Sequence, residues 1–452
     1  MALKQMDALA ALREAAGEVI ETSLCDVQGS WLALVNTEEG KRLAFAAKGE
    51  AALSALWKDV EKEADVKDVH VSVMALNANN AALVRRYVKW TAPTACGTKG
   101  ASIGFSDWLG EADAVVAELF GKRQLKPVLV DFTTEDSEAL QRYFVQAVDT
   151  ATWGVLEEGY KEGYGANAAG LKTEEEIVKA LLYGYSMIGF DCSDKIDLGI
   201  EKLSDEAVDK RFEQFNETFR AALHASYLNA EFKVGTSKIT FTENQLHRIV
   251  LEYGEAIMHI QFIYNSYLKN TPWDIDFELD LSKPGKVLTP QEHYLIGNEL
   301  QRNGIKLSSI CLDPLKDSEA VNDNLQLHCE IADTFGYRLS FKNADIAMND
   351  TAAAMKYLKG KVHFKMNNIL WMSAIELVKA LDADLFGKLC AACGCEATAD
   401  AADRALVLGY RKALNPKEES NVAADMKAFL EAHHAEYAAA IKDNVAAKLK
   451  NI

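Results

Sequence analysis

The sequence predicts an α/β fold in which parallel strands, each followed by a helix, close into a barrel. Three observations lead to this prediction: short apolar runs recur along most of the chain, long helical periods separate them, and several runs end in a polar or charged residue. Nearly continuous apolar strands that alternate with helices are typical of parallel sheets. A closed barrel is the simplest such object, and such folds carry their chemistry at the carboxyl ends of the strands.

Six segments have the strand pattern, and most of the chain between them has helical periodicity. The strand segments are Pro127–Asp131, Met187–Asp191, Ile275–Leu279, Ser308–Leu312, Tyr337–Phe341 and Lys361–Lys365. Long helices are expected over residues 204–229, 242–269 and 417–450, the last being Ala-rich and suited to packing across the barrel exterior. Thr242 and Gln245 have the spacing of a capping box, which predicts where the second helix begins.

The first 90 residues follow a different pattern. Strand-like runs such as Trp31–Val35 and Val69–Val73 alternate there with amphipathic helical stretches, which favours a mixed α+β arrangement. We therefore predict an N-terminal α+β lobe over residues 1–90. Residues 91–452 are predicted to form a TIM-barrel-like (β/α) barrel with a C-terminal helical extension.

Composition and charge exclude several classes of protein. The 452 residues are 49% hydrophobic and 26% charged, which is ordinary globular usage. Lys and Arg number 49 against 67 for Asp and Glu, giving a net charge of -18, and no basic stripe is present that could bind nucleic acid. No apolar run reaches the length of a membrane span. Charged residues such as Asp7 and Arg13 interrupt the region of a signal peptide, so we expect a cytoplasmic protein.

The eight cysteines are expected to be reduced thiols, because nothing in the sequence indicates export. Cys390, Cys393 and Cys395 lie close enough in sequence to bind a soft metal. No second ligand pair at the spacing of a zinc ribbon follows them, which favours a structural role over a metal site.

A glycine-rich segment, residues 149–166, is the most distinctive in the chain. Its glycines, among them Gly154 and Gly159, allow tight turns and close approach of backbone to backbone or to a ligand, so the residues alone leave open a packing loop or a site. As a string it closely resembles the corresponding loop of the bacterial tagaturonate epimerases, which interconvert tagaturonate and fructuronate. Shorter similarities extend over most of residues 30–450, for example at Ile188–Asp194 and Val362–Lys365.

The resemblance implies a metal-assisted sugar-acid epimerase, an isomerase of carbohydrate metabolism. Inversion at C4 of a 2-keto sugar acid is beyond simple enolisation, whereas a divalent cation that polarises the C2 carbonyl supports retro-aldol cleavage between C3 and C4. The sequence does not distinguish Mn²⁺, Zn²⁺ and Mg²⁺. Such a site also needs a general base and cations for the substrate carboxylate.

Glu278 is the first candidate for this chemistry. Asp274, Asp276, Glu278 and Asp280 fall on one face of a strand at period two, which makes Glu278 a candidate base and metal ligand, the alternative being a solvated strand end. His363 and Lys365 share a face of another strand. His363 is a candidate metal ligand or a hydrogen-bonded core histidine, and Lys365 is a candidate catalytic cation.

Four further residues are candidates for binding substrate: Lys342, Asp191, Asp194 and Tyr410. Lys342 would add a second cation near Lys365. Asp191 and Asp194 follow a strand, so capping of the next helix is their alternative role. His259 and His328, by contrast, have apolar neighbours on helices and are expected to be packing histidines.

The chain departs from the family pattern mainly at polar positions. Lys342 stands where the family has a histidine, Asp313 replaces an arginine, and Ser282 and Lys283 replace an Asp-Glu pair, whereas Tyr410 is retained. A protonated lysine does not ligate a metal. Two functions therefore stay open: a sugar-acid epimerase with altered or lost metal use or activity, and a non-catalytic relative that serves as a binding or self-assembling homo-oligomeric protein.

Overall fold

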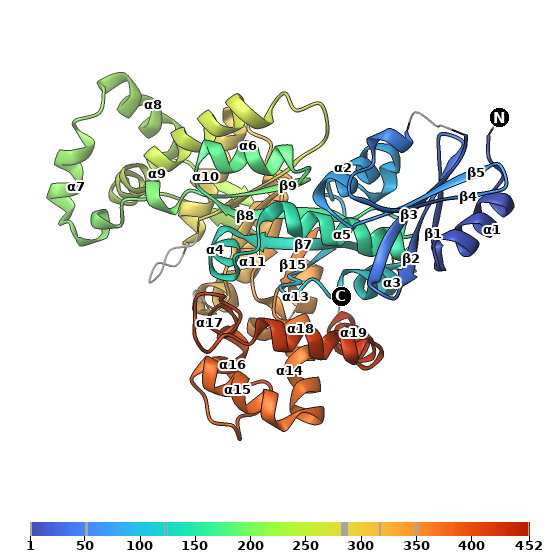
Figure 1. The fold of residues 1–452 in the computed structure, drawn as a ribbon. Coiled ribbons are helices and arrows are strands. Elements are labelled where there is room, and N and C mark those ends of the chain that lie inside the picture. The colour runs from blue at the N-terminus through green and yellow to red at the C-terminus, as the bar shows by residue number, and fades with distance from the viewer. Residues whose placement is uncertain are drawn as a thin grey trace.

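A computed structural model describes residues 2–49, 53–121, 123, 125–281, 288–315, 318–348, 351–450 and 452. Within these residues eight parallel strands close into a barrel in chain order, as Figure 1 shows at its centre. The strands are β6 (Ser102–Phe105), β7 (Lys126–Thr133), β8 (Gly165–Leu171), β9 (Met187–Asp191), β12 (Asp276–Asp280), β13 (Ser309–Leu312), β14 (Arg338–Phe341) and β15 (Val362–Met366). The predicted fold class is confirmed.

Each of the six predicted strands corresponds to a barrel strand, whereas β6 and β8 were missed. β6 has only four residues, one of them glycine, so it is too short to show a strand pattern, and β8 is Gly- and Ala-rich and lacks the β-branched and aromatic residues by which strands are recognised. The glycine-rich segment is not a loop for most of its length. Residues 144–158 form helix α5 (Phe144–Glu158), Gly159 ends it with a φ of 60°, and β8 begins at Gly165.

Gly154 lies inside α5 because a second helix crosses there. A Cβ at this position would lie 2.7 Å from the backbone nitrogen of Ala114 on helix α3 (Asp113–Phe120). Only glycine allows the two backbones to approach so closely. The conspicuous glycine of the sequence therefore serves helix packing.

The N-terminal residues form a five-stranded antiparallel sheet, drawn in blue in Figure 1, in the order β1-β2-β3-β5-β4. Its strands are β1 (Glu18–Val27), β2 (Ser30–Thr37), β3 (Gly40–Lys48), β4 (Val60–Val66) and β5 (Val69–Met74). Helix α1 (Gln5–Ala15) buries one face of the sheet. The other face packs on α2 (Ala78–Tyr87) and on Trp153 and Leu156 of α5, which joins the sheet to the barrel.

Two of the three predicted long helices are broken. Residues 204–229 form α7 (Asp205–Phe212) and α8 (Glu217–Tyr227), because Asn216 caps a new helix. Residues 417–450 likewise contain α18 (Ala423–Ala432) and α19 (His434–Leu449), and α19 packs on α14 (Ile369–Leu381) and α3.

The third helix, α9 (Glu243–Ile263), begins as predicted, with Thr242 and Gln245 forming the capping box, and continues into a π-helical turn at Tyr264–Leu268. The remaining helices are α4 (Thr134–Leu140), α6 (Glu174–Leu182), α10 (Pro290–Arg302), α11 (Ser318–Phe335), α12 (Ala344–Ala347), α13 (Thr351–Tyr357), α15 (Ala383–Cys393), α16 (Arg404–Leu408) and α17 (Tyr410–Ala413). A short hairpin joins β10 (Phe232–Val234) to β11 (Ser237–Ile239). Among the described helices, none combines the length and apolar character needed to cross a bilayer.

Candidate functional site

The interior of the barrel is polar, although interiors of this kind are usually filled by branched aliphatic side chains. Side chains that alternate along the strands carry charge or hydroxyl groups into it, and each is at most 2% exposed: Ser102, Asp131, Asn167, Asp276, Glu278, Ser309, Arg338, Ser340, His363 and Lys365. Burying polar groups is costly unless they bind one another. Such a network indicates a functional interior rather than a purely structural one.

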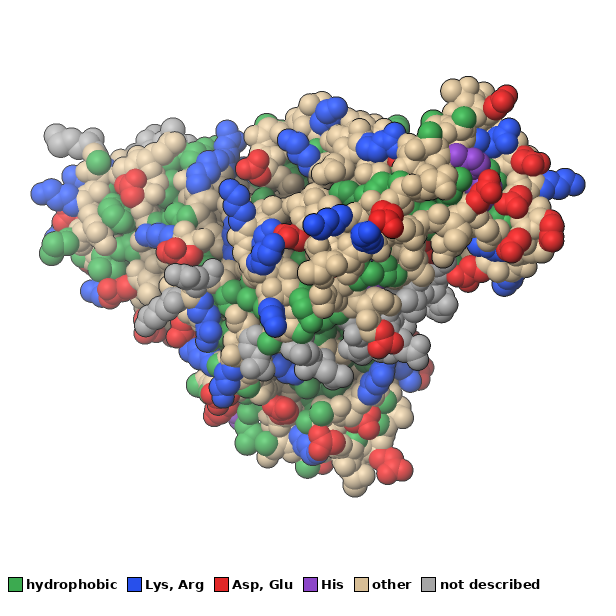
Figure 2. Space-filling view, turned by 180° about the vertical axis from the view of Figure 1, so that it is seen from behind, with side chains coloured by type: hydrophobic (Ala, Val, Ile, Leu, Met, Phe, Trp, Pro, Cys, Tyr) green, Lys and Arg blue, Asp and Glu red, His purple; other side chains and the backbone are tan. Residues whose placement is uncertain are grey.

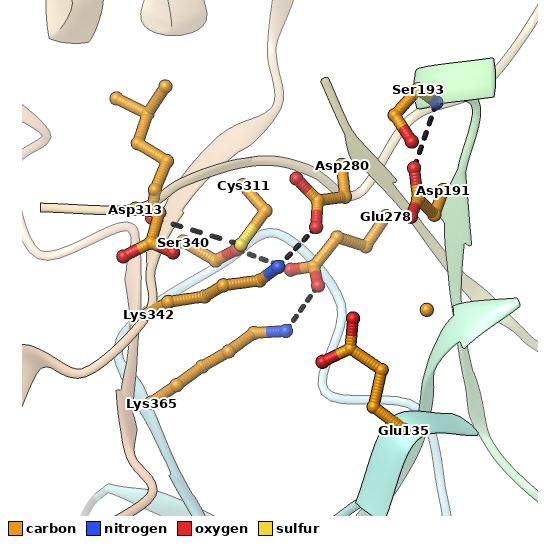
Figure 3. A network of polar contacts seen from close by, with 12 residues as sticks. Glu135, Asp191, Ser193, Glu278, Asp280, Cys311, Asp313, Ser340, Lys342 and Lys365 are labelled. Carbon is orange, nitrogen blue, oxygen red and sulfur yellow. Dashed lines mark hydrogen bonds and ion pairs between the residues drawn. The ribbon is translucent and has the colours of Figure 1, made fainter. Parts of the chain in front are cut away.

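Glu278 and Lys365 form the central ion pair of this interior. The Lys365 Nζ lies 2.5 Å from Oε1 of Glu278 and 3.7 Å from Oδ1 of Asp131. Ser309 donates a hydrogen bond to Oε2 of Glu278 at 2.9 Å, and Ser340 donates a second. Figure 3 shows the Lys365 side chain reaching across the barrel to the Glu278 carboxylate.

Burial and ion pairing oppose each other in setting these protonation states. Burial raises the pKa of Glu278, but the Lys365 ammonium, His363 and the Ser340 hydroxyl together outweigh it, so the net pKa is lowered. Burial dominates at Asp131, whose pKa is raised despite the nearby ammonium. The pKa of Lys365 is raised because Asp131 and Glu278 outweigh its own desolvation. The two carboxylates of the cluster therefore shift in opposite directions, Asp131 toward its protonated form and Glu278 toward its ionised form.

His363 lies in the same interior as Glu278, below the mouth of the barrel. Its Nδ1 is 2.8 Å from the Ser102 hydroxyl, which accepts a hydrogen bond from Arg338 at the same distance. Burial, with the charges of Arg338 and Lys365, lowers the pKa of His363 to about 3. His363 is therefore a neutral imidazole at physiological pH, consistent with the hydrogen-bonded core histidine as well as with a ligand.

The residues around Glu278 and His363 do not fit a divalent cation. The Glu278 carboxylate already binds the Lys365 ammonium, and Asp280, the next carboxylate along β12, binds the Lys342 ammonium. The imidazole of His363 lies in the field of Arg338 and of the same Lys365. A metal ligand must present unneutralised charge or a lone pair to the ion. Lysines neutralise both of these carboxylates, so of these groups only Nε2 of His363, which has no hydrogen-bond partner among the described residues, stays available to an ion.

A cavity of about 820 Å³ opens at the carboxyl ends of the strands. Of the predicted site residues, Lys365, Lys342, Asp191 and Tyr410 line it. Glu278 and His363 are buried beneath it and Asp194 lies beside it. The structure therefore gathers the candidates at one end of the barrel in two layers, a lining layer and a buried supporting layer.

Lys172, which the sequence analysis did not single out, joins the two aspartates at the cavity edge. Its Nζ lies 3.7 Å from Asp191 and 3.1 Å from Asp194. Asp191 also accepts a hydrogen bond from the backbone NH of Ser193 at 2.8 Å, a turn contact that precedes the short helix at Ser193–Lys195, whose N-cap is Cys192. The side chain of Asp194 is 68% exposed, so it faces solvent more than the cavity.

Tyr410 anchors the C-terminal helices to the mouth. Its hydroxyl donates to Asp136 at 2.6 Å, Arg411 donates to the same carboxylate at 2.7 Å, and the Tyr410 ring stacks on Trp108. Because α17 is far from α4 in sequence, only the tertiary structure brings these groups together. Arg411 also lines the cavity and was missed.

Several interior residues were missed although a signal was present. Ser309, Arg338 and Ser340 are polar residues at alternate positions of otherwise apolar strands. In a strand of a helix-covered parallel sheet, which is buried on both faces, such an alternation places polar groups inside the protein. Ser282 and Lys283, where the chain departs from the family pattern, lie outside the described residues.

The remaining sequence candidates have structural surroundings. His328 is buried and its Nδ1 lies 2.9 Å from Nδ1 of His293, whereas His259 is half-buried beside Phe190. All eight cysteines are free thiols. Burial raises the pKa of Cys390 to about 11, which disfavours the thiolate that binds metal.

Among the described residues, the only group of three or more His, Cys, Asp or Glu side chains whose ligand atoms lie close enough to share a metal is outside the barrel. It comprises His224, Glu243 and His247 on α8 and α9, with ligand atoms within 4.8 Å of one another.

Comparison with known proteins identifies similar chains over nearly the whole length. The model of the tagaturonate epimerase family matches residues 20–436. The tagaturonate/fructuronate epimerase of Thermotoga maritima is 27% identical over 383 residues, which are 82% of this chain and 78% of that protein. A glycerol-complexed crystal structure of the fructuronate-tagaturonate epimerase from Cohnella laeviribosi has a TM-score of 0.85 at 25% identity and covers 98% of both chains. The native crystal structure of that enzyme gives a TM-score of 0.84.

Proposed function

Because the chain belongs to the tagaturonate epimerase family, we propose that it binds a keto-hexuronate in the mouth cavity and inverts one of its carbons there. One observation carries the proposal. A polar cavity of about 820 Å³ is lined at the strand ends by Lys342 and by Lys365, whose ammonium binds the buried Glu278 carboxylate. On a chain with a net charge of -18, these lysines are the local cations that a sugar acid needs.

The proposed reaction is retro-aldol cleavage and re-addition. The carboxylate of Asp131 takes the proton of the C4 hydroxyl, the C3–C4 bond breaks, and its electron pair forms an enolate at C2 and C3. The Lys365 ammonium stabilises the enolate oxygen. After the aldehyde rotates, the C3–C4 bond re-forms on the other face and Asp131 returns the proton. Atoms and electrons balance without a co-reactant.

Glu278 has a positioning role in this proposal. It was predicted from the sequence to be a base, but unlike Asp131 it does not line the cavity, and its carboxylate binds the Lys365 ammonium, so it acts by holding that ammonium in place. Lys342 is proposed to bind the substrate carboxylate. Asp191 and Tyr410, which line the cavity, are proposed to bind hydroxyl groups, and Asp194 acts through Lys172.

No step of this reaction passes through a metal. The prediction that Glu278 and His363 hold a divalent cation stays a prediction, and a chelator tests it. If the lysines supply the positive charge, EDTA leaves turnover unchanged. Turnover that EDTA abolishes and Mn²⁺, Zn²⁺ or Mg²⁺ restores would overturn the lysine assignment.

A non-catalytic binding protein is the second candidate. It is favoured by the pairing of the cations at the mouth: Lys342 binds Asp280, Lys365 binds Glu278, and Arg411 binds Asp136. Because each cation is already fixed by a carboxylate, the side chains at the mouth form a rigid surface, which is compatible with binding a ligand without reacting with it. This candidate predicts sugar-acid binding without turnover.

The deciding experiment is ¹H NMR of tagaturonate and fructuronate incubated separately with the full-length protein. Interconversion in both directions is expected, with kcat lowered about 10²- to 10³-fold in Lys365→Met and Asp131→Asn. Lys388→Met, an exposed lysine on α15, is the matched control and should keep full activity. Binding in calorimetry without interconversion would establish the second candidate, and absence of both would refute both.

The remaining predictions concern organisation rather than chemistry. We propose residues 1–90 and 91–452 as the two units of the chain. Homo-oligomerisation is tested by sedimentation velocity, in which a single species at the 49.8 kDa of one chain would contradict it. The expected cytoplasmic location is tested by fractionation of cells that produce the protein.

A further inference from the structure

A group of three histidine and glutamate side chains lies on the projection formed by α7, α8 and α9, away from the barrel at the left of Figure 1. His224 is in the last turn of α8, and Glu243 and His247 are one turn apart on α9, so the latter two share a helix face. The proposed reaction at the barrel mouth uses none of these residues.

We infer that His224, Glu243 and His247 form a binding site for a divalent transition-metal cation, with Zn²⁺ as the best fit. The two Nε2 atoms are 2.9 Å apart, and Oε1 of Glu243 is 4.0 Å from Nε2 of His224. Ligands of a tetrahedral Zn²⁺ at about 2.0–2.1 Å are separated by about 3.3 Å. Shifts of less than about 1 Å therefore bring all three atoms to a common ion.

The surroundings of His247 orient it as a ligand. Its Nδ1 lies 2.7 Å from Oδ1 of Asp209 on α7, which fixes the proton on Nδ1 and leaves Nε2 as a lone-pair donor. The Phe212 ring stacks on the imidazole with a centroid separation of 3.8 Å and holds its plane. A carboxylate behind a histidine is the usual second partner of a zinc ligand.

The site is open to solvent on one side. His247 is 5% exposed, whereas the side chains of His224 and Glu243 are 32% and 63% exposed, so an ion can enter without unfolding the helices. In Figure 2, where the projection lies at the right, histidine reaches the surface among acidic side chains. Two histidines and one carboxylate leave a fourth position for water, and the bound ion would tie α8 to α9.

The test is calorimetric titration of metal-stripped, full-length protein with Zn²⁺ alone. One Zn²⁺ per chain with a dissociation constant below about 1 µM is expected. His247→Ala should weaken binding at least about 100-fold, and Asp209→Asn about 10- to 100-fold. His259→Ala, a histidine on the same helix, and Glu278→Gln in the barrel should leave binding unchanged.

Two further measurements keep the inference decidable. Co²⁺ should give the visible absorption of a four-coordinate site in the wild type and not in His247→Ala. Circular dichroism checks the fold of each variant, and His224→Gln, at a half-exposed position, replaces His247→Ala if the latter does not fold. If the protein binds no Zn²⁺, or binds it equally well when His224 or His247 is replaced, the inference is overturned. The two imidazoles would then be joined only by a hydrogen bond.

Discussion

Lys365→Met is expected to destabilise the protein strongly, because it removes the cation shared by two buried carboxylates. Lys365 is 2% exposed, and its ammonium lies 2.5 Å from Glu278 and 3.7 Å from Asp131. Removing one partner of a buried ion pair costs about 3–5 kcal/mol of unfolding free energy. Methionine retains most of the volume of the lysine side chain, so the loss reflects charge rather than packing.

The pH dependence of this deficit follows from the pKa shifts. In the wild type the pKa of Glu278 is lowered, so its contribution is present above the unfolded value of about 4.5 and is lost as pH falls through the folded pKa. The pKa of Lys365 is raised, so its contribution is fully present below 10.5. Without Lys365, burial raises the pKa of Glu278. Acid then stabilises the variant relative to neutral pH, and the deficit should shrink between pH 7.5 and pH 5.

Urea unfolding followed by circular dichroism at both pH values measures the effect. The double variant Glu278→Gln with Lys365→Met should be at least about 1 kcal/mol more stable than Lys365→Met at pH 7.5, since it no longer buries that carboxylate without its partner. Lys388→Met should change stability by less than about 0.5 kcal/mol. A Lys365→Met protein as stable as the wild type at pH 7.5, or a deficit that grows on acidification, would refute the reasoning.

Three other substitutions test the helix packing and the mouth. Gly154→Ala should lower the free energy of unfolding by about 1–3 kcal/mol in thermal unfolding, because the added Cβ would lie 2.7 Å from the backbone of α3. Its control is Gly254→Ala, where the added Cβ would have no neighbouring heavy atom within 4 Å. That substitution should be neutral or stabilising by up to about 1 kcal/mol. Equal losses in the two would contradict the crossing contact. Tyr410→Phe should cost about 1.5–3 kcal/mol in urea unfolding by removing a buried hydrogen bond to a carboxylate, and an unchanged midpoint would contradict that contribution. Lys342→Met should raise the KM for a keto-hexuronate about 10-fold or more with a smaller effect on kcat, whereas a loss confined to kcat would assign Lys342 to the chemistry instead.

The strands that the sequence identified are those whose local residue pattern is typical of a buried strand. Ile275–Leu279 and Tyr337–Phe341 are short, alternate apolar with polar residues and are flanked by helical periods, and each corresponds to a barrel strand within one residue. β8 was missed because its residues, Gly165–Leu171, are small and have weak intrinsic preference for a strand. Its neighbours in the barrel, β7 and β9, hold it in the extended conformation.

The breaks within the predicted long helices have local causes, and the hydrophobic periodicity of the sequence does not reveal them. The apolar pattern over residues 204–229 continues across the break because both α7 and α8 pack on the same core, while Asn216 restarts the helix. His433 separates α18 from α19 by its non-helical backbone, with φ -117° and ψ 35°, and makes no side-chain cap. Amphipathic periodicity reports which face is buried, and it does not report whether the helix axis is continuous.

The sequence by itself determined the barrel, the family and a few of the charged groups at its mouth, Asp191, Lys342 and Lys365, since strand alternation and short motifs are local properties of the chain. Only the tertiary structure decided how those charges pair. Lys365 neutralises Glu278 and Lys342 neutralises Asp280 across the barrel, so the carboxylates that the sequence offers as metal ligands are bound to lysines. The convergence of His224 with His247 likewise depends on how α8 packs against α9. Electrostatic interactions depend on distances between residues far apart in the chain, and folding alone sets those distances.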